Sequence, residues 1–102
     1  MKFYLYEIVQ YITILDDKQL GDEVYKILEP KIKKCFANNT KFVIDFSNID
    51  AITTEFLYKA IGNIFVHFEN EKLSSLISFS GLDVKKRDVL KWVISNTLCK
   101  ED

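Results

Sequence analysis

The sequence predicts an α/β domain, a small and mostly parallel or mixed β-sheet with about three α-helices packed against it. Strand-like and helix-like segments alternate along the chain, and apolar residues in the helix-like segments recur every three or four positions. Strands separated by helices favour parallel pairing with right-handed crossovers. With 102 residues, of which 48% are hydrophobic, the chain can build one core, so we expect a single domain over residues 1–102.

The first half of the chain predicts two strands and a helix. Residues 2–15 (KFYLYEIVQYITIL) are rich in aromatic and β-branched residues, which favours one long strand or a hairpin. An apolar stripe then predicts a helix, which Pro30 should kink. Residues 41–46 (KFVIDF) follow a polar break and predict a central strand covered on both faces. The apolar stripe of the predicted helix consists of Leu20, Val24, Ile27, Leu28, Ile32, Cys35 and Phe36.

The second half predicts a helix, a strand and a last helix. A clean apolar stripe between Phe56 and Phe68 predicts a helix that begins near Thr54. Residues 74–80 (SSLISFS) predict a strand, and the glycine that follows predicts a turn. In the last helix Trp92 lies beside the inward stripe; exposure there would mark an interaction patch, but partial burial against the sheet is favoured. The inward positions of this helix are Val89, Leu90, Val93, Ile94 and Leu98.

Charge and composition argue against several classes of function. Fourteen Lys and Arg residues against 15 Asp and Glu give a net charge of -1, which provides no general attraction to nucleic acid or anionic lipid. No uncharged run approaches the roughly 18 apolar residues of a membrane helix. Cys35 and Cys99 lack the spacing of metal ligands and are expected to be reduced, partly buried thiols. We therefore expect a cytoplasmic protein without nucleic-acid or membrane partners.

Motifs for catalysis are missing from the sequence. No glycine-rich phosphate loop, nucleophile elbow or zinc-protease motif is present. The only histidine, His67, falls on a helix that packing already explains. We expect no enzyme activity, no cofactor and no metal.

The junction between the central strand and the second helix is the candidate functional site. In open parallel sheets, binding sites lie where strand C-terminal ends meet helix N-termini. A helix N-terminus presents unpaired N–H groups and a partial positive charge. Thr53 or Thr54 is suited to cap this helix, and Glu55 to complement its dipole. Asp45 at the strand end either accepts N–H groups of the loop or serves a site, and the former is favoured.

The segment VIDFSNIDAITTEFLYKAIG, residues 43–62, resembles the signature of bacterial STAS-like proteins, relatives of the anti-sigma factor antagonists and of the cytoplasmic domains of sulfate transporters. The matching elements are Asp45, the loop from Ser47 to Ile52, and the polar residues before Phe56. The resemblance covers about residues 41–68. It implies a small regulatory domain that docks onto a partner, typically a kinase-like ATPase that phosphorylates a serine at this helix start.

One residue departs from that family pattern. In an ungapped comparison the acceptor serine falls on Glu55, and Thr53 stands where the antagonists carry Asp. Glutamate cannot accept phosphate, so the acceptor is Thr54 or Thr53, or Glu55 is a permanent anion that mimics phosphorylation only in part.

Together these features predict a non-enzymatic cytoplasmic regulatory module that binds a protein partner through residues 47–57. The resemblance implies a histidine-kinase-like ATPase or an anti-sigma-type regulator as the partner. The alternative is a small-ligand or nucleotide sensor that uses the same helix N-terminus, although Glu55 would repel an anionic ligand. A structural subunit is a third possibility, and we expect a monomer or a weak homodimer. The predicted partner-binding or switch residues are Asp45, Ser47, Asn48, Asp50, Thr53, Thr54 and Glu55.

Overall fold

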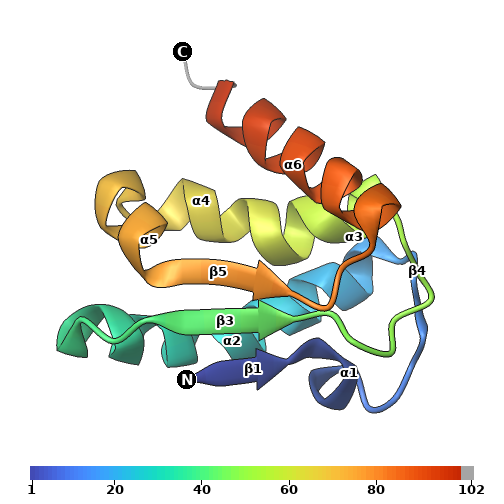
Figure 1. The fold of residues 1–102 in the computed structure, drawn as a ribbon, viewed down its shortest axis with the longest axis horizontal. Coiled ribbons are helices and arrows are strands. Elements are labelled where there is room, and N and C mark those ends of the chain that lie inside the picture. Colours follow the sequence, from blue (N-terminus) through green and yellow to red (C-terminus); the bar gives the residue numbers. More distant parts are fainter. Residues whose placement is uncertain (100–102) are drawn as a thin grey trace.

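The computed structural model of the chain describes residues 1–99 and contains two parallel sheets (Figure 1). The main sheet has three strands, β1 (Lys2–Tyr4), β3 (Phe42–Asp45) and β5 (Ile77–Ser80), with β3 in the middle. The second sheet pairs β2 (Ile14–Leu15) with β4 (Ala51–Ile52). The predicted α/β class and the central position of residues 42–45 are confirmed.

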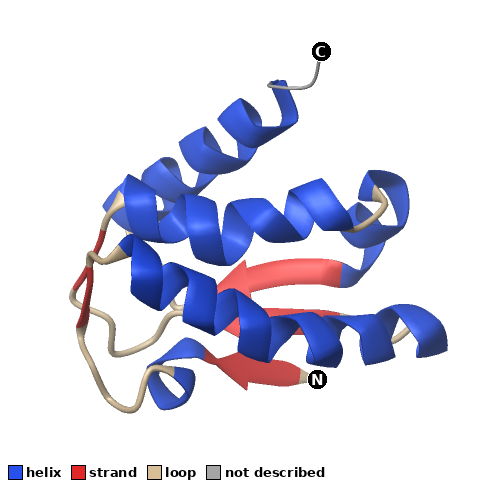
Figure 2. Cartoon of the chain, turned by 180° about the vertical axis from the view of Figure 1, so that it is seen from behind, coloured by secondary structure: helices blue, strands red, loops and turns tan. Residues whose placement is uncertain are grey.

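Two long helical segments cover the main sheet on one side (Figure 2). The first is α2 (Lys18–Asn38). The second is a continuous helical rod made of α3 (Thr54–Leu57), the π-helix η1 (Tyr58–Gly62) and α4 (Asn63–His67). A last helix, α6 (Val84–Cys99), packs against α3, η1 and α4. Among the described residues, none of these helices is both long and apolar enough to cross a membrane.

Local hydrogen bonds set the limits of α2. The side chain of Asp17 accepts the N–H of Gln19 at 2.9 Å and so caps the helix start. Asn39 adopts a left-handed conformation with φ 52° and ends the helix, as a residue after a helix C-terminus often does. Between them the helix continues through Pro30. Its buried side chains are Val24, Tyr25, Leu28, Ile32 and Cys35.

The main sheet has one covered and one open face. Phe3 and Ile44 stand in the same row of the sheet and are fully or almost fully buried beneath the helices. On the opposite face, Lys2 and Ser78 flank Val43 in register; both are exposed, and Val43 is half-buried. The prediction that the central strand is covered on both faces is therefore wrong. Both long crossover segments lie on the same side, and the other side carries Lys2, Tyr4, Val43 and Ser78 without a covering helix.

The N-terminal segment differs most from its prediction. Residues 2–15 form neither one strand nor a hairpin, because β1 pairs with β3 while β2 pairs with β4. Between β1 and β2 lie the short helix α1 (Leu5–Ile8) and a turn at Gln10 and Tyr11, both with positive φ. Further along, helix α5 (Asn70–Leu76) includes the first three residues predicted as strand, so β5 begins only at Ile77.

Two side chains predicted to face inward, and Trp92 beside the inward stripe, are more exposed than expected. Ile27 of α2 and Leu98 of α6 are both exposed. Trp92 is 55% exposed, and its ring meets the ring of Tyr58 edge-on at 6.2 Å. Cys35 is buried and free, as expected of a reduced thiol, and the side chain of Cys99 lies outside the described residues.

Gly21 allows α2 to cross the helical rod at very short range. A Cβ atom at this position would lie 2.7 Å from the carbonyl oxygen of Phe56 and 2.7 Å from Cβ of Lys59. No side chain fits there without displacing backbone. The first turns of α2 are therefore fixed against the beginning of the rod.

Candidate functional site

Asp45 is buried at the C-terminal end of the central strand and is only 4% exposed. Its Oδ1 accepts the backbone N–H of Ser47 at 2.7 Å, and its Oδ2 accepts the hydroxyl of Ser80 at 2.7 Å. Lys2 brings its Nζ to 3.4 Å from Oδ2. Burial alone would raise the pKa of Asp45, but the hydrogen bonds from Ser47, Ser80 and Lys2 outweigh it and lower the pKa to about 2. The carboxylate is therefore charged at neutral pH, and both its oxygens are engaged within the fold.

Ser47 is held between the end of β3 and the turn after β5. The preceding residue, Phe46, donates its N–H to the carbonyl of Ser80 at 2.8 Å. Gly81 has φ 74°, and a Cβ there would lie 2.5 Å from the backbone nitrogen of Ser47. Only glycine combines this backbone conformation with this close approach. The turn after β5 therefore fixes the point at which the candidate loop leaves the sheet.

The far end of the loop is fixed by the segment before α2. The N–H of Asp50 donates to the carbonyl of Thr13 at 2.7 Å, and the N–H of Thr53 donates to the carbonyl of Leu15 at 3.0 Å. The loop also buries Ile49 as an anchor. The exposed side chains of Ser47, Asn48 and Asp50 are thus presented by a backbone that is tied down at both ends.

The helix start combines a cap with an exposed acid. Thr53 accepts the N–H of Phe56 on its Oγ1 at 3.3 Å, which makes it the N-cap of α3. Thr54 is half-buried, and its hydroxyl lies 3.4 Å from Oε1 of Glu55. Glu55 is exposed in the first turn and, within residues 1–99, takes part in no ion pair. This carboxylate is available to a partner in a way that Asp45 is not.

A shallow depression adjoins the helix start. It has a volume of about 360 Å³ and is lined by Thr54 together with Asp88, Val89 and Trp92 of α6. An exposed Trp in such a place is typical of residues that dominate binding energy at interfaces. The position of Trp92 beside the inward stripe of the helix was the one sequence signal for this depression, and the exposed alternative, not the favoured partial burial, is what the structure shows.

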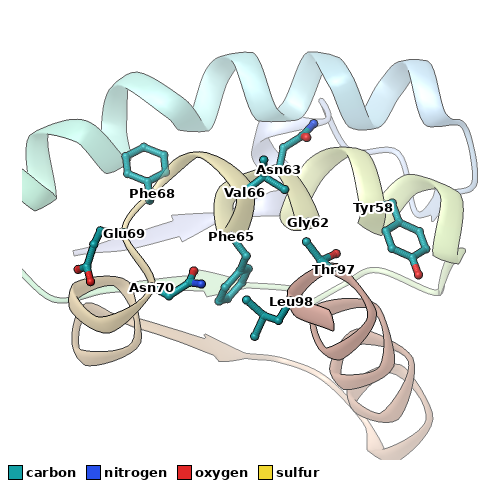
Figure 3. Close-up of a pocket in the computed structure, with 10 residues that line it drawn as sticks. All are labelled: Tyr58, Gly62, Asn63, Phe65, Val66, Phe68, Glu69, Asn70, Thr97 and Leu98. Atoms are coloured by element: carbon teal, nitrogen blue, oxygen red, sulfur yellow. The ribbon is translucent and has the colours of Figure 1, made fainter. Parts of the chain in front are cut away.

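A larger hollow of about 540 Å³ lies between α4, the beginning of α5 and the end of α6 (Figure 3). Two of its polar side chains bond within their own helices: Asn63 donates to the carbonyl of Lys59 at 2.8 Å, and Thr97 donates to the carbonyl of Val93 at 2.9 Å. Glu69 caps α5. The hollow contains none of the predicted site residues and is best described as a gap in helix packing. It is lined by Tyr58, Gly62, Asn63, Phe65, Val66, Phe68, Glu69, Asn70, Thr97 and Leu98.

The structure places the predicted site residues in three consecutive groups. Asp45 and Ser47 form the tie to β5, Asn48 and Asp50 stand on the exposed loop, and Thr53 to Glu55 begin the helix. No hydrogen bond among the described residues joins the first group to the third. The sequence analysis missed Lys2 and Ser80 as partners of Asp45, because nothing in the sequence marks contacts between residues so far apart.

The fold and this junction define a small α/β domain of the STAS-like class. A comparison with protein families matches residues 21–87, more than half of the chain, to the family described as a STAS-like domain of unknown function (DUF4325). The chain belongs to this family, and the resemblance predicted from residues 43–62 is confirmed. Neither the search of curated proteins nor the search of solved structures finds a match.

Proposed function

We propose that the chain is a non-enzymatic regulatory module that binds a partner protein through the loop from Ser47 to Ile52 and the helix start that follows. One observation carries this proposal: the loop presents exposed polar side chains on a backbone fixed at both ends, by Asp45 on one side and by Thr13 and Leu15 on the other. A surface that is already ordered loses little conformational entropy on binding. Binding residues also concentrate on loops held by a rigid scaffold.

The partner we propose is a kinase-like ATPase or an anti-sigma-type regulator in the bacterial cytoplasm. Membership of a STAS-like family supports a regulatory role, and the resemblance to anti-sigma factor antagonists supplies the class of partner. Exposed Trp92 beside Thr54 supports an interface that extends from the helix start onto α6.

Phosphorylation of the module, where it occurs, falls on Thr54 or Thr53. The hydroxyl of Thr53 accepts the N–H of Phe56, so a phosphate there would replace the cap, whereas Thr54 has no capping role. Glu55 beside Thr54 supplies a fixed charge at the same place. Mass spectrometry of the protein isolated from cells should find phosphate on these two threonines, and phosphopeptides that map only to Ser74 or Ser75 would contradict the assignment.

The decisive experiment measures partner binding in variants of Glu55. The partner is first isolated by affinity purification from the native bacterium, and its affinity for the chain is then measured by calorimetry. Glu55→Ser removes the fixed charge and should strengthen binding of a kinase-like ATPase, whereas Glu55→Lys should weaken any interaction that uses the carboxylate. Glu71→Lys is the matched control, because Glu71 is also an exposed acid in the first turn of a helix.

Equal affinities for the wild type and both Glu55 variants would contradict this role of the helix start. A rise in melting temperature with nucleotide alone, together with the absence of any protein partner, would favour the ligand-sensing alternative instead.

A further inference from the structure

The turn after α1 holds its backbone in an unusual conformation. Gln10 and Tyr11 have φ values of 57° and 70°, a region that residues with side chains of this size seldom adopt. The N–H of Tyr11 donates to the carbonyl of Tyr6 at 2.8 Å, and the two tyrosine rings meet edge-on at 5.2 Å. The turn is therefore held in one shape although its backbone is strained.

This turn leads into three large apolar side chains that lie in solvent. Tyr11 is 66% exposed, Ile12 45% and Ile14 54%. Between the two isoleucines, the carbonyl of Thr13 accepts the N–H of Asp50 and so faces the candidate loop. Exposed apolar side chains are common singly, but such a group in one short segment is typical of an interaction site.

A groove of about 440 Å³ runs between this segment and the first turns of α2. Its apolar wall is formed by Ile12, Ile14 and Leu20, and its polar rim carries Asp16, Asp17, Gln19 and Glu23. Asp17 is engaged in capping α2. Within residues 1–99, Asp16 and Glu23 take part in no ion pair. Residues 12–23 contain four acids and a single basic residue, Lys18, so the groove is apolar inside and negatively charged at its rim.

We propose that this groove receives a segment of the partner protein that carries aliphatic side chains next to Lys or Arg. The aliphatic side chains fill the space between Ile12, Ile14 and Leu20, and the basic groups meet Asp16 and Glu23. Opposite charges at the rim of an interface accelerate association and select against wrong partners, while the apolar centre supplies affinity. This inference rests on the proposed function, because it names the chemistry of the partner that the neighbouring loop binds.

The groove and the candidate loop form one continuous surface. Ile14 pairs with Ala51 in the parallel sheet of β2 and β4, and β4 (labelled in Figure 1) forms the last two residues of the loop. Directly before these strands, the N–H of Asp50 donates to the carbonyl of Thr13. A segment bound in the groove therefore lies next to the loop from Ser47 to Ile52.

Selection from a library of random 12-residue peptides displayed on phage tests the proposed chemistry. The full chain is immobilised, and the most enriched peptides are synthesised and measured by calorimetry. We expect enrichment of Lys or Arg together with Ile, Leu or Val, and affinity that falls at least fivefold between 50 and 500 mM salt, as screening of opposite charges requires. A library without binders, or binders without basic residues, overturns the proposal.

Variants of the groove then locate the bound peptide. The double change Ile12→Ser and Ile14→Ser should weaken binding at least tenfold, and Asp16→Asn with Glu23→Gln should weaken it at least threefold and remove most of the salt dependence. The second variant touches no apolar packing, so it remains informative if the first lowers the melting temperature. Val84→Ser and Glu71→Gln are controls, because they alter an exposed apolar residue and an exposed acid elsewhere; they should leave affinity within twofold. Equal binding by all variants overturns the proposal.

The same variants separate this inference from the function on which it rests. If the purified partner is lost by Glu55→Lys but retained by both groove variants, the groove proposal falls and the proposed function stands. If the groove variants lose the partner and Glu55→Lys keeps it, the groove stands and the helix start is excluded. A dimer in sedimentation that the groove variants abolish would assign the groove to a second copy of this chain and overturn the proposal.

Discussion

The two carboxylates at the ends of the candidate loop are in opposite environments. Asp45 is buried, and both its oxygens accept hydrogen bonds from within the chain. Glu55 is exposed, and its carboxylate accepts the hydroxyl of Thr54 at 3.4 Å. A buried charge is tolerated only when it is paired, whereas an exposed charge at a helix start contributes a fraction of a kcal/mol to stability.

The buried carboxylate of Asp45 therefore contributes to the stability of the junction, whereas the exposed carboxylate of Glu55 is accessible to a partner. Changes around Asp45 should affect folding first, because they leave buried groups without partners. Changes around Glu55 should affect binding with little effect on folding. Variants at both ends of the loop measure how sharp this division is.

Gly81→Ala should give the largest loss of stability. The change places a Cβ 2.5 Å from the backbone nitrogen of Ser47 in a left-handed backbone conformation. Strain and steric overlap together should cost about 3 kcal/mol. Thermal and denaturant unfolding measure this loss, and Gly62→Ala is the control, because the contacts there are longer and the backbone conformation is not left-handed. Equal losses in the two variants would show that the Asp45 end is not exceptionally close-packed.

Asp45→Ala should cost about 1 to 3 kcal/mol, because the N–H of Ser47 and the hydroxyl of Ser80 lose their acceptor. The pKa of Asp45 is lowered to about 2 in the folded state, against about 3.9 in an unfolded chain. The group therefore stabilises the fold by about 2.5 kcal/mol above about pH 5, and this contribution is lost as the pH falls through the unfolded and then the folded pKa, between about pH 5 and pH 1.

Asp45→Asn separates the charge from the hydrogen bonds. It keeps an acceptor for Ser47 but removes the titration, so the wild type should lose its stability advantage over this variant between about pH 5 and pH 1. Unfolding measured across this range checks the sign. An advantage that is independent of pH, or an unchanged melting temperature with lost partner binding, would show that the acid serves a site rather than the fold.

Thr53→Ala should cost about 1 kcal/mol through loss of the cap that accepts the N–H of Phe56. Thr53→Ser retains the hydroxyl and should restore most of this stability. Thr54→Ala, one residue along, lacks a capping role and should change stability less. If Thr54→Ala is the more destabilising of the two threonine variants, the assignment of the N-cap is wrong.

Gln10→Gly should give the smallest effect and the opposite sign. Glycine adopts the left-handed conformation at this position without strain, so the change should stabilise the fold by about 0.5 kcal/mol or less after the greater freedom of the unfolded chain is included. Denaturant unfolding of Gln10→Gly beside Glu7→Gly in α1 provides the comparison, since the latter should destabilise. A destabilised Gln10→Gly would mean that the side chain itself holds the turn.

Long patterns in the sequence predicted most of the fold, and short segments caused the errors. The stripe after Thr54 extends far enough for its period to identify a helix, and the apolar run from Phe42 was recognised as a strand by the polar break before it. Residues 2–15 contain no Gly, Pro or Asn to mark the turn at Gln10 and Tyr11, so their β propensity concealed two separate strands and a helix. The open face of the sheet was also hidden, because no local pattern reports on which side two distant helices cross.

The candidate site was predicted only where its residues are close in sequence. Thr53 to Glu55 form the helix start as expected, because capping is a local property. The partners of Asp45 come from β1 and β5, and the groove brings Ile12 and Ile14 against α2; these contacts depend on how the strands pair. The π-helix η1 is likewise without a sequence signal, and it turns the residues after Gly62 relative to an uninterrupted α-helix.

The crossing of α2 over the rod at Gly21 has a consequence for multivalent recognition. Leu20 and Glu23 of the groove flank Gly21 on α2, and the rod that Gly21 contacts begins at Thr54. The distance between the groove and the helix start is therefore set by the close contact of the two helices at Gly21. A partner that contacts both the groove and the helix start would form its second contact at a high effective concentration, because no flexible linker separates the two sites on this chain. Two individually weak contacts can then give one strong complex, and a change in the spacing of the partner's two segments would reduce its affinity more than the loss of any single hydrogen bond.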